Sequence, residues 1–233
     1  MQAPNRLLTT VTALLIATPA FAALSKDDVK RLNESATVLS EIRNAPDGVP
    51  DSTWAKAECV VVIPGLKKAG FIVGGEFGSG VMSCRHANGW APPVFMHLTK
   101  GSAGLQAGAQ SIDLVLLVMN RSGADKLLSN KVTLGADASI AAGPVGRAAS
   151  AATDAEMTAE MLSYSRAKGL FAGIDLSGGS LAPDDAANSR AYGSNVSARD
   201  VALGTATLAT PAAAKAFTNA LSRDVRATSG VKK

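Results

Sequence analysis

The run Cys59-Val60-Val61-Val62-Ile63, closed by Pro64-Gly65, decides the fold of this chain. It is too short for a helix and is rich in β-branched residues, which favour strands. It therefore predicts a buried strand. Two further strand candidates follow at residues 71–73 and 81–85, and the glycine-rich residues 74–80 separate them. Together the three segments predict a β-meander.

Strand and helix patterns alternate through the rest of the chain. Residues 112–119 and 170–176 are strand candidates, and residues 132–138 alternate apolar and polar side chains with the period of a half-buried strand. Residues 122–128 predict a short helix. Pro183 and Pro211 have the character of first-turn prolines, and Thr210 is the expected N-cap of a closing helix over residues 211–226.

The first helix is marked more clearly than the others. Ser25 is a suitable N-cap, with Asp28 at the capping-box position. Apolar residues then recur at helical spacing until the helix ends before Pro46, namely Val29, Leu32, Ala36, Leu39 and Ile42. The expected fold class is α+β: a single domain with a mainly antiparallel sheet or partial barrel, and N- and C-terminal helices packed on it.

The first 22 of the 233 residues have the pattern of a signal peptide. Arg6 is their only charge, an apolar stretch spans Leu7 to Ala17, and the small-residue pattern Ala20-Phe21-Ala22 follows. We expect cleavage near Ala22, which leaves residues 23–233 as the mature domain in the periplasm or outside the cell. Loss of Arg6 leaves 22 basic against 19 acidic residues, and these are dispersed, so nucleic acid is not an expected partner.

Several motifs in this order resemble the SYLF domain over most of residues 25–225. They include Val61-Val62-Ile63-Pro64, Lys67-Lys68-Ala69-Gly70-Phe71, Trp90-Ala91-Pro92-Pro93, Gly143-Pro144-Val145-Gly146-Arg147 and Tyr164-Ser165-Arg166-Ala167-Lys168-Gly169-Leu170-Phe171. In eukaryotes that family is associated with phosphoinositide binding at membranes and with actin regulation, often beside Src-homology or FYVE modules. This chain carries neither module. The resemblance implies binding to anionic lipid or a membrane surface, without turnover.

Lys67 and Lys68 are the best candidate lipid contacts, because we expect them in a glycine-bounded turn between strands. Arg85 and Lys100 could add to this site. Solubility at a hairpin tip is an equally good interpretation of the two lysines. Arg166 and Lys168 form a second possible patch, for which solvated surface is the favoured interpretation.

The first helix is a poor membrane anchor, because its basic and acidic residues cancel and it has no aromatic residue. We expect its apolar face to cover the sheet. Export would also remove the chain from cytosolic actin, so actin is not an expected partner. The predicted function is a non-catalytic lipid-binding module of the cell envelope. An envelope protein-interaction module is the alternative, and a small hydrolase with an unrecognised site is a weaker one.

Catalytic and metal-binding patterns are weak. The chain has no nucleophile elbow, phosphate-binding loop or zinc-protease helix, so no enzyme activity or cofactor is expected. His86 and His97 could join Asp113 and a serine in a catalytic triad. Triads are recognised by the geometry of their side chains and not by their order in the sequence, so the structure must decide this point. Cys59, Cys84 and the two histidines lack the paired spacing of structural zinc sites.

The same two cysteines are disulfide candidates in an oxidising compartment. In a three-strand meander Cys59 and Cys84 would lie on outer strands, about 9 to 10 Å apart and beyond the reach of a disulfide. Bonding requires the first and third segments to be neighbours, so the pairing stays open. Asp113, Asp137 and Asp175 lie in apolar or glycine-rich strand candidates. They should face solvent or bond to backbone or to an arginine such as Arg147, with a shared polar pocket as the alternative.

Overall fold

The computed structural model describes residues 24–45, 48–70, 73–87, 89–103, 108–129, 131–145, 158–167, 170–205 and 208–222. The strands are β1 (Cys59–Gly70), β2 (Val73–His86), β3 (Gly89–Trp90), β4 (Val94–Ala103), β5 (Gly108–Val118), β6 (Val132–Thr133), β7 (Ile140–Ala142), β8 (Met161–Ala167), β9 (Leu170–Gly173) and β10 (Ser180–Pro183). The helices are α1 (Lys26–Asn44), α2 (Asp51–Lys56), α3 (Arg121–Ser129), α5 (Asp185–Tyr192), α6 (Ala198–Ala202), the 3₁₀ turn η2 (Ala212–Ala214) and α7 (Lys215–Ser222).

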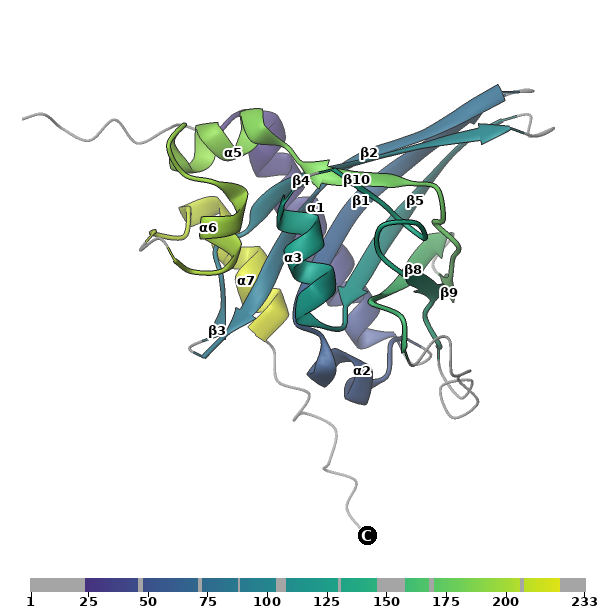
Figure 1. Cartoon of the computed structure of the whole chain (residues 1–233), viewed down its shortest axis with the longest axis horizontal. Coiled ribbons are helices and arrows are strands. Elements are labelled where there is room, and N and C mark those ends of the chain that lie inside the picture. The colour runs from purple at the N-terminus through teal and green to yellow at the C-terminus, as the bar shows by residue number, and fades with distance from the viewer. Residues whose placement is uncertain are drawn as a thin grey trace, which may run out of the picture.

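One curled sheet forms the centre of the domain, in the order β6-β10-β4-β2-β1-β5-β8-β7. Its pairings are antiparallel except for the parallel pair of β7 and β8. The helices lie on both sides of it (Figure 1). The sheet is a half-barrel with helices at both ends of the chain, so the predicted α+β single domain is confirmed.

The central strand β1 is buried on both of its faces. Val60 and Val62 belong to a core that contains α1 and α7, and we call this side the α1 face. Val61 and Ile63 belong to a second core that contains α3 and α6, on the α3 face. A strand that is buried on both faces has apolar residues at successive positions and does not alternate apolar with polar residues, which explains the continuous apolar run. The predicted buried strand is confirmed.

Helix α1 covers the sheet as predicted. Ser25 caps it, and Asp28 completes the capping box. Leu32, Leu39 and Ile42 are fully buried in the core of the α1 face. An apolar helix stripe that packs on a sheet is not available to a membrane.

The predicted meander is wrong, because residues 73–86 form the single strand β2. Glycines in its middle permit the close approach of β1. A Cβ on Gly78 would lie 2.5 Å from Ile63 Cγ2, and one on Gly80 would lie 1.9 Å from the Val62 carbonyl oxygen. Here glycine marks tight packing between strands and not a loop.

Other boundaries also differ from the expectations. Residues 132–138 leave the strand after Thr133 and turn at Gly135, whose φ is +83°. Pro183 ends β10 and Asp184 caps the following helix, whereas Pro211 precedes a 3₁₀ turn and α7. Residues 223–226 of the expected closing helix lie outside the described residues.

Asp28 couples α1 to α5 and should make stability depend on pH. Burial alone would raise its pKa, but hydrogen bonds that Arg190 and the Ser25 N–H donate to the carboxylate lower the pKa of Asp28 from 3.8 to about 2. The carboxylate therefore stabilises the fold above pH 4, and this contribution is lost as the pH falls from about 4 to 2.

We expect Asp28→Asn to lower the free energy of unfolding at pH 5 by on the order of 2 kcal/mol. The variant should then lose less stability than the wild type between pH 5 and pH 2, as measured by urea unfolding. Equal losses in the two proteins would show that Asp28 does not carry the effect.

Candidate functional site at the projecting end of the sheet

A bulge in β1 sets which side chains the outer half of that strand presents. Ile63 pairs with Leu114 and Leu66 pairs with Ile112, so Pro64 and Gly65 together oppose only Asp113. Gly65 adopts a φ of +58°, which glycine tolerates without strain. After this insertion, alternation places Lys67 on the α1 face and Lys68 on the α3 face.

Asp113 holds the bulge in place. One of its carboxylate oxygens accepts the Gly65 N–H at 3.0 Å, and the other accepts from Arg166 Nη2 at 2.6 Å. Arg166 also forms an ion pair with Glu41 of α1. Arg166, which belongs to the second possible patch, therefore bonds to side chains of the fold itself. Lys168, the other residue of that patch, lies outside the described residues.

The other two predicted acids also have local partners. Asp137 accepts the Thr133 N–H at 2.7 Å within a turn. Asp175 accepts from the hydroxyl and the N–H of Ser177, and these bonds lower the pKa of Asp175. The expectation that these acids bond to backbone or to an arginine is confirmed, although the arginine is Arg166 and Arg147 lies outside the described residues. They do not converge on a shared pocket.

Strands β1, β2 and β5 project beyond the helices (Figure 1). We call residues 67–70, 73–77, 99–103 and 108–111 the sheet extension, which pairing across four strands holds together. Lys67 and Lys68 lie within β1 and not in a turn, so that part of the prediction is wrong. Pairing within the sheet holds the backbone of both lysines.

Lys68 and Lys100 flank one acid on the α3 face. Glu76 is in register with both lysines, and Lys68 Nζ lies 3.0 Å from Glu76 Oε1. Lys100 Nζ donates to the Asp175 carbonyl oxygen at 3.3 Å. Both cations already have partners from the chain, which reduces what they offer to a ligand.

Lys67 differs from the other predicted contacts. Its ammonium lies 5.7 Å from the centre of the Phe77 ring, in cation–π contact, and the Phe77 side chain is 54% exposed. Within the described part of the chain, Lys67 has no hydrogen-bond or ion-pair partner. An exposed cation beside an exposed aromatic ring is therefore the distinctive feature of the α1 face of the sheet extension.

Arg85 does not join this site. It lies nine residues beyond Glu76 along β2, or about 30 Å at ~3.3 Å per residue. Its guanidinium stacks 4.6 Å from the Trp90 ring centre and donates to the carbonyl oxygens of Ala57 and Trp54. Arg85 therefore contributes to packing at the end of the sheet opposite to Lys67 and Lys68.

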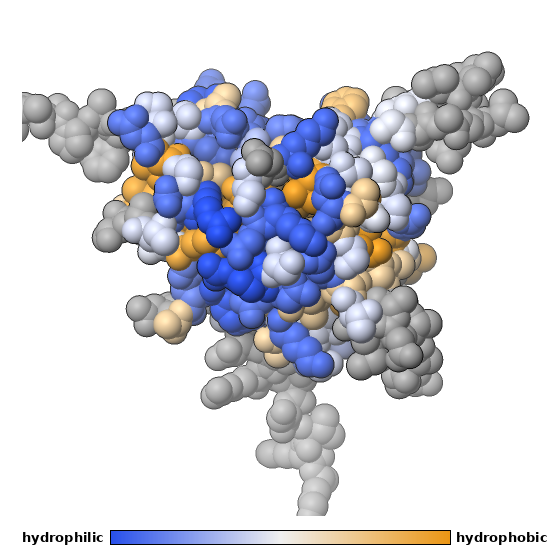
Figure 2. All heavy atoms as spheres, viewed as in Figure 1, coloured by the Kyte–Doolittle hydropathy of each residue, from blue (hydrophilic) through white to orange (hydrophobic). Residues whose placement is uncertain are grey.

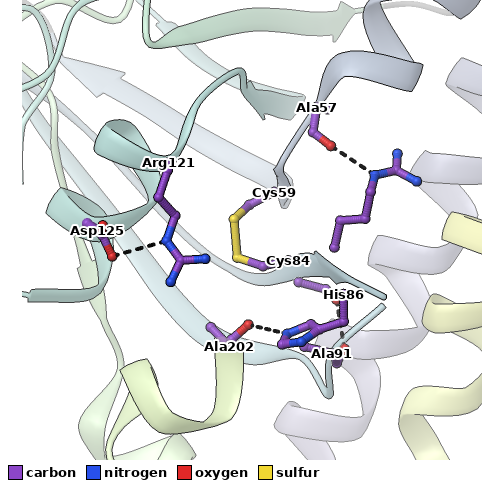
Figure 3. Close-up of a disulfide and its surroundings, with 10 residues drawn as sticks. Ala57, Cys59, Cys84, His86, Ala91, Arg121, Asp125 and Ala202 are labelled. Carbon is purple, nitrogen blue, oxygen red and sulfur yellow. Dashed lines mark hydrogen bonds and ion pairs between the residues drawn. A yellow bond between two sulfur atoms is a disulfide. The ribbon is translucent and has the colours of Figure 1, made fainter. Parts of the chain in front are cut away.

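A disulfide joins Cys59 to Cys84 at this opposite end (Figure 3). The two residues face each other in register because β1 and β2 are direct neighbours. His86 follows on β2, with Nε2 2.8 Å from the Ala202 carbonyl oxygen of α6. These contacts tie the base of the β1–β2 hairpin to the helical layer.

The residues of the possible triad are not brought together. His97 lies on β4 and Asp113 on β5, with β2 and β1 between them, which corresponds to about 14 Å. His86 bonds to α6, and Asp113 bonds to Gly65 and Arg166. Among the described residues no group of three or more histidine, cysteine or acidic side chains is placed to hold a metal ion.

A pocket that the sequence did not reveal adjoins Lys67. It has a volume of about 450 Å³ and lies between the first turns of α1 and the strands. Its walls are formed by Asp27, Lys30, Arg31, Glu34, Pro64, Gly65, Lys67, Phe77, Gly78, Ser79 and Ser111. The pocket joins residues of α1 to residues 30 to 84 positions later, and no local pattern could predict that contact.

The face that carries α3 is mainly hydrophilic at its centre, with hydrophobic residues in small separate areas (Figure 2). It presents no broad apolar surface to a partner. None of the helices in the described ranges is long and apolar enough to cross a bilayer.

Comparison with known proteins identifies the domain. Residues 99–224 match the family model described as "Ysc84: Las17-binding protein actin regulator". The chain belongs to the Ysc84 family. This confirms at the level of the family the SYLF resemblance seen in the sequence.

Curated relatives of the Ysc84 family cover most of this chain. LAS seventeen-binding protein 3 of Saccharomyces cerevisiae is 34% identical over 170 residues, which is 71% of this chain and 37% of the relative. SH3 domain-containing YSC84-like protein 1 of Xenopus laevis is 32% identical over 173 residues, covering 72% and 50%. The mouse protein of that name is 31% identical over 183 residues, covering 77% and 53%.

The chain spans about half or less of the length of these relatives. The name of the yeast relative describes binding, the family description adds actin regulation, and neither names a reaction. These properties are stated for the yeast protein and for the family model. The predicted signal peptide, export and exclusion of actin remain predictions.

Proposed function

We propose that this Ysc84-family chain is a non-catalytic binding module that docks on anionic lipid surfaces through Lys67 and Phe77. The observation that carries the proposal is the exposed Lys67 ammonium, which has no carboxylate partner among the described residues and lies over the exposed Phe77 ring. Lys68, Lys100 and Arg166 each have a partner within the fold, so Lys67 is the predicted cation best placed for an external anion.

The chemistry of this pair suits a membrane interface. A basic residue near an anionic surface contributes about 1 kcal/mol, and an aromatic ring favours the boundary between head groups and acyl chains. Strand pairing holds the backbone at both residues before binding, so no loop has to be ordered on contact.

The predicted cleavage after Ala22 would place this contact in the periplasm or outside the cell. We therefore leave actin out of the proposal, although the matching family is described as an actin regulator. An anionic leaflet or vesicle surface is the proposed partner. An envelope protein with an acidic surface is the alternative occupant of the same residues.

Vesicle co-sedimentation at low salt tests the proposal. The wild type should bind vesicles of phosphatidylglycerol and phosphatidylcholine, and binding should weaken as salt screens the charges. Lys67→Glu changes the local charge by two and should weaken partitioning by about 2 kcal/mol, or roughly 30-fold. Phe77→Ala should also weaken binding, but without increasing its salt dependence.

Two controls separate this site from general charge. Lys131→Glu makes the same charge change at another exposed lysine and should leave binding nearly unchanged. Lys68→Gln combined with Glu76→Gln removes an ion pair without changing net charge, and should also have little effect. Equal weakening by Lys67→Glu and Lys131→Glu, or no vesicle binding at low salt, would refute the lipid proposal and favour a protein partner.

A further inference from the structure

The pocket beside Lys67 has a size and a lining that suit a small molecule. Its volume of about 450 Å³ lies within the usual range for ligand sites, which combine some apolar surface with a few well-placed polar groups. One wall is a single stripe of α1, with Asp27, Lys30, Arg31 and Glu34 at helical spacing. The other walls come from the bulge in β1 and from β2 and β5.

Some of these polar groups are already committed to the fold. Arg31 forms an ion pair with Asp184 at 2.9 Å and lies 5.4 Å from the Phe95 ring centre. Lys30 and Glu34 approach each other only to 3.8 Å, and both side chains are at least half exposed. They form a loose pair that a ligand could open at little cost.

Other polar groups remain open to a ligand. Among the described residues, Asp27, Lys67, Ser79 and Ser111 have no side-chain partner in a hydrogen bond or ion pair, and all four are exposed. Together they offer one ammonium, one carboxylate and two hydroxyls in a pocket that Phe77 also lines. Asp184 balances Arg31 and Glu34 balances Lys30, so Lys67 and Asp27 are the two charged groups of the lining that remain for a ligand.

We infer that this pocket binds an acidic sugar, with its anionic group at Lys67 and its hydroxyls at Asp27, Ser79 and Ser111. A carboxylate accepts hydrogen bonds from sugar hydroxyls, and the aromatic ring can pack against the apolar C–H face of a pyranose. A simple anion would use Lys67 but leave Asp27 to repel it, and a neutral sugar would leave the Lys67 ammonium without an anionic partner. Only a ligand with both kinds of group matches the whole lining.

The inference shares Lys67 with the proposed function, and it rests on that proposal only if the sugar is the head group of a membrane glycolipid. A soluble acidic sugar would present the same chemistry. The two sources can be separated by comparing free glucuronate with vesicles that carry a glucuronosyl glycolipid, and with vesicles of phosphatidylglycerol that carry no sugar.

Titration of the mature domain with glucuronate, followed by two-dimensional NMR, tests the site directly. Shifts should concentrate at Asp27, Lys67, Ser79 and Ser111. Glucose and acetate should each bind at least tenfold more weakly than glucuronate, because each lacks one of the two kinds of group. Lys67→Gln and Asp27→Asn should each weaken glucuronate about tenfold, as expected for loss of a hydrogen bond to a charged group.

Matched controls keep the two proposals distinguishable. Lys131→Gln and Glu58→Gln remove the same charges at exposed positions outside the pocket and should not change glucuronate binding. Asp27→Asn should not weaken binding to phosphatidylglycerol vesicles, because it removes no positive charge. Absence of glucuronate binding, or equal binding of acetate or of glucose, would overturn the acidic-sugar site even where vesicle binding by Lys67 and Phe77 persists.

Discussion

Removing the disulfide should lower the free energy of unfolding by about 3 kcal/mol. Cys59 and Cys84 are separated by 25 residues, and a crosslink that closes a loop of this length restricts the unfolded chain by about that amount. The double variant Cys59→Ala, Cys84→Ala should therefore unfold at a clearly lower urea concentration than the oxidised wild type. The sheet should still form, because the pairing of β1 with β2 extends well beyond the crosslink.

Unfolding of the wild type in the presence of reductant is the control for packing that is lost in the double variant. Both cysteines are buried, so alanine also removes contacts with the core of the α3 face. Wild type unfolded in reductant keeps the sulfur atoms and loses only the bond. The chain has two cysteines, so reductant should not change the double variant. A wild type with the same unfolding midpoint with and without reductant would contradict the expected stabilisation.

Gly80→Ala should destabilise the domain by about 3 kcal/mol, at the upper end of the usual cost of overpacking. An added Cβ would lie 1.9 Å from the Val62 carbonyl oxygen and 2.8 Å from Ile63 Cα. Both atoms belong to the backbone of β1 and cannot rotate away. Relief requires the two central strands to separate, which would disturb packing on both faces of the sheet.

Gly101→Ala is the matched control for this effect. Gly101 lies in β4, and a Cβ there would meet no atom within 4 Å. Its replacement should be neutral or slightly stabilising, because alanine restricts the unfolded chain. Urea unfolding of both variants measures the difference. Similar stabilities for Gly80→Ala and Gly101→Ala would mean that β1 and β2 are less closely packed than described.

The sequence predicted those parts of the fold that depend on local chemistry. The capping box at Ser25 and Asp28 and the apolar spacing of α1 identify a helix whatever lies around it. The β-branched run at Val60–Val62 likewise identifies a buried strand. By contrast, residues 74–80 have the composition of a loop but form part of a strand, in which Gly78 and Gly80 leave the space that Val62, Ile63 and Leu66 of β1 occupy. Those residues lie on another strand and are not visible locally.

The same distinction holds for the candidate site. Charge and neighbouring glycines were enough to select Lys67 and Lys68, but not to separate them. Their difference depends on Glu76, which pairs with Lys68, and on Phe77, which lies under Lys67. Arg85 was added to the same site, but the continuous strand β2 carries it to the opposite end of the sheet. The position of α1 over the strands, which creates the pocket, is a tertiary contact with no local signal.

The extra residue in the bulge at Pro64 and Gly65 changes the alternation of side chains between the two faces of the sheet, so the two halves of β1 differ in which residues face α1. Before the insertion, the strand contributes side chains to the hydrophobic cores on both faces of the sheet. After it, the strand presents the Lys67 ammonium toward α1. Deleting one of these two residues would exchange the faces of the two lysines that follow, so that Lys68 would lie on the α1 face and Lys67 on the α3 face. The number of residues in the bulge therefore decides which lysine faces α1. A change of length at this point can alter the charges on the surface without any substitution in it.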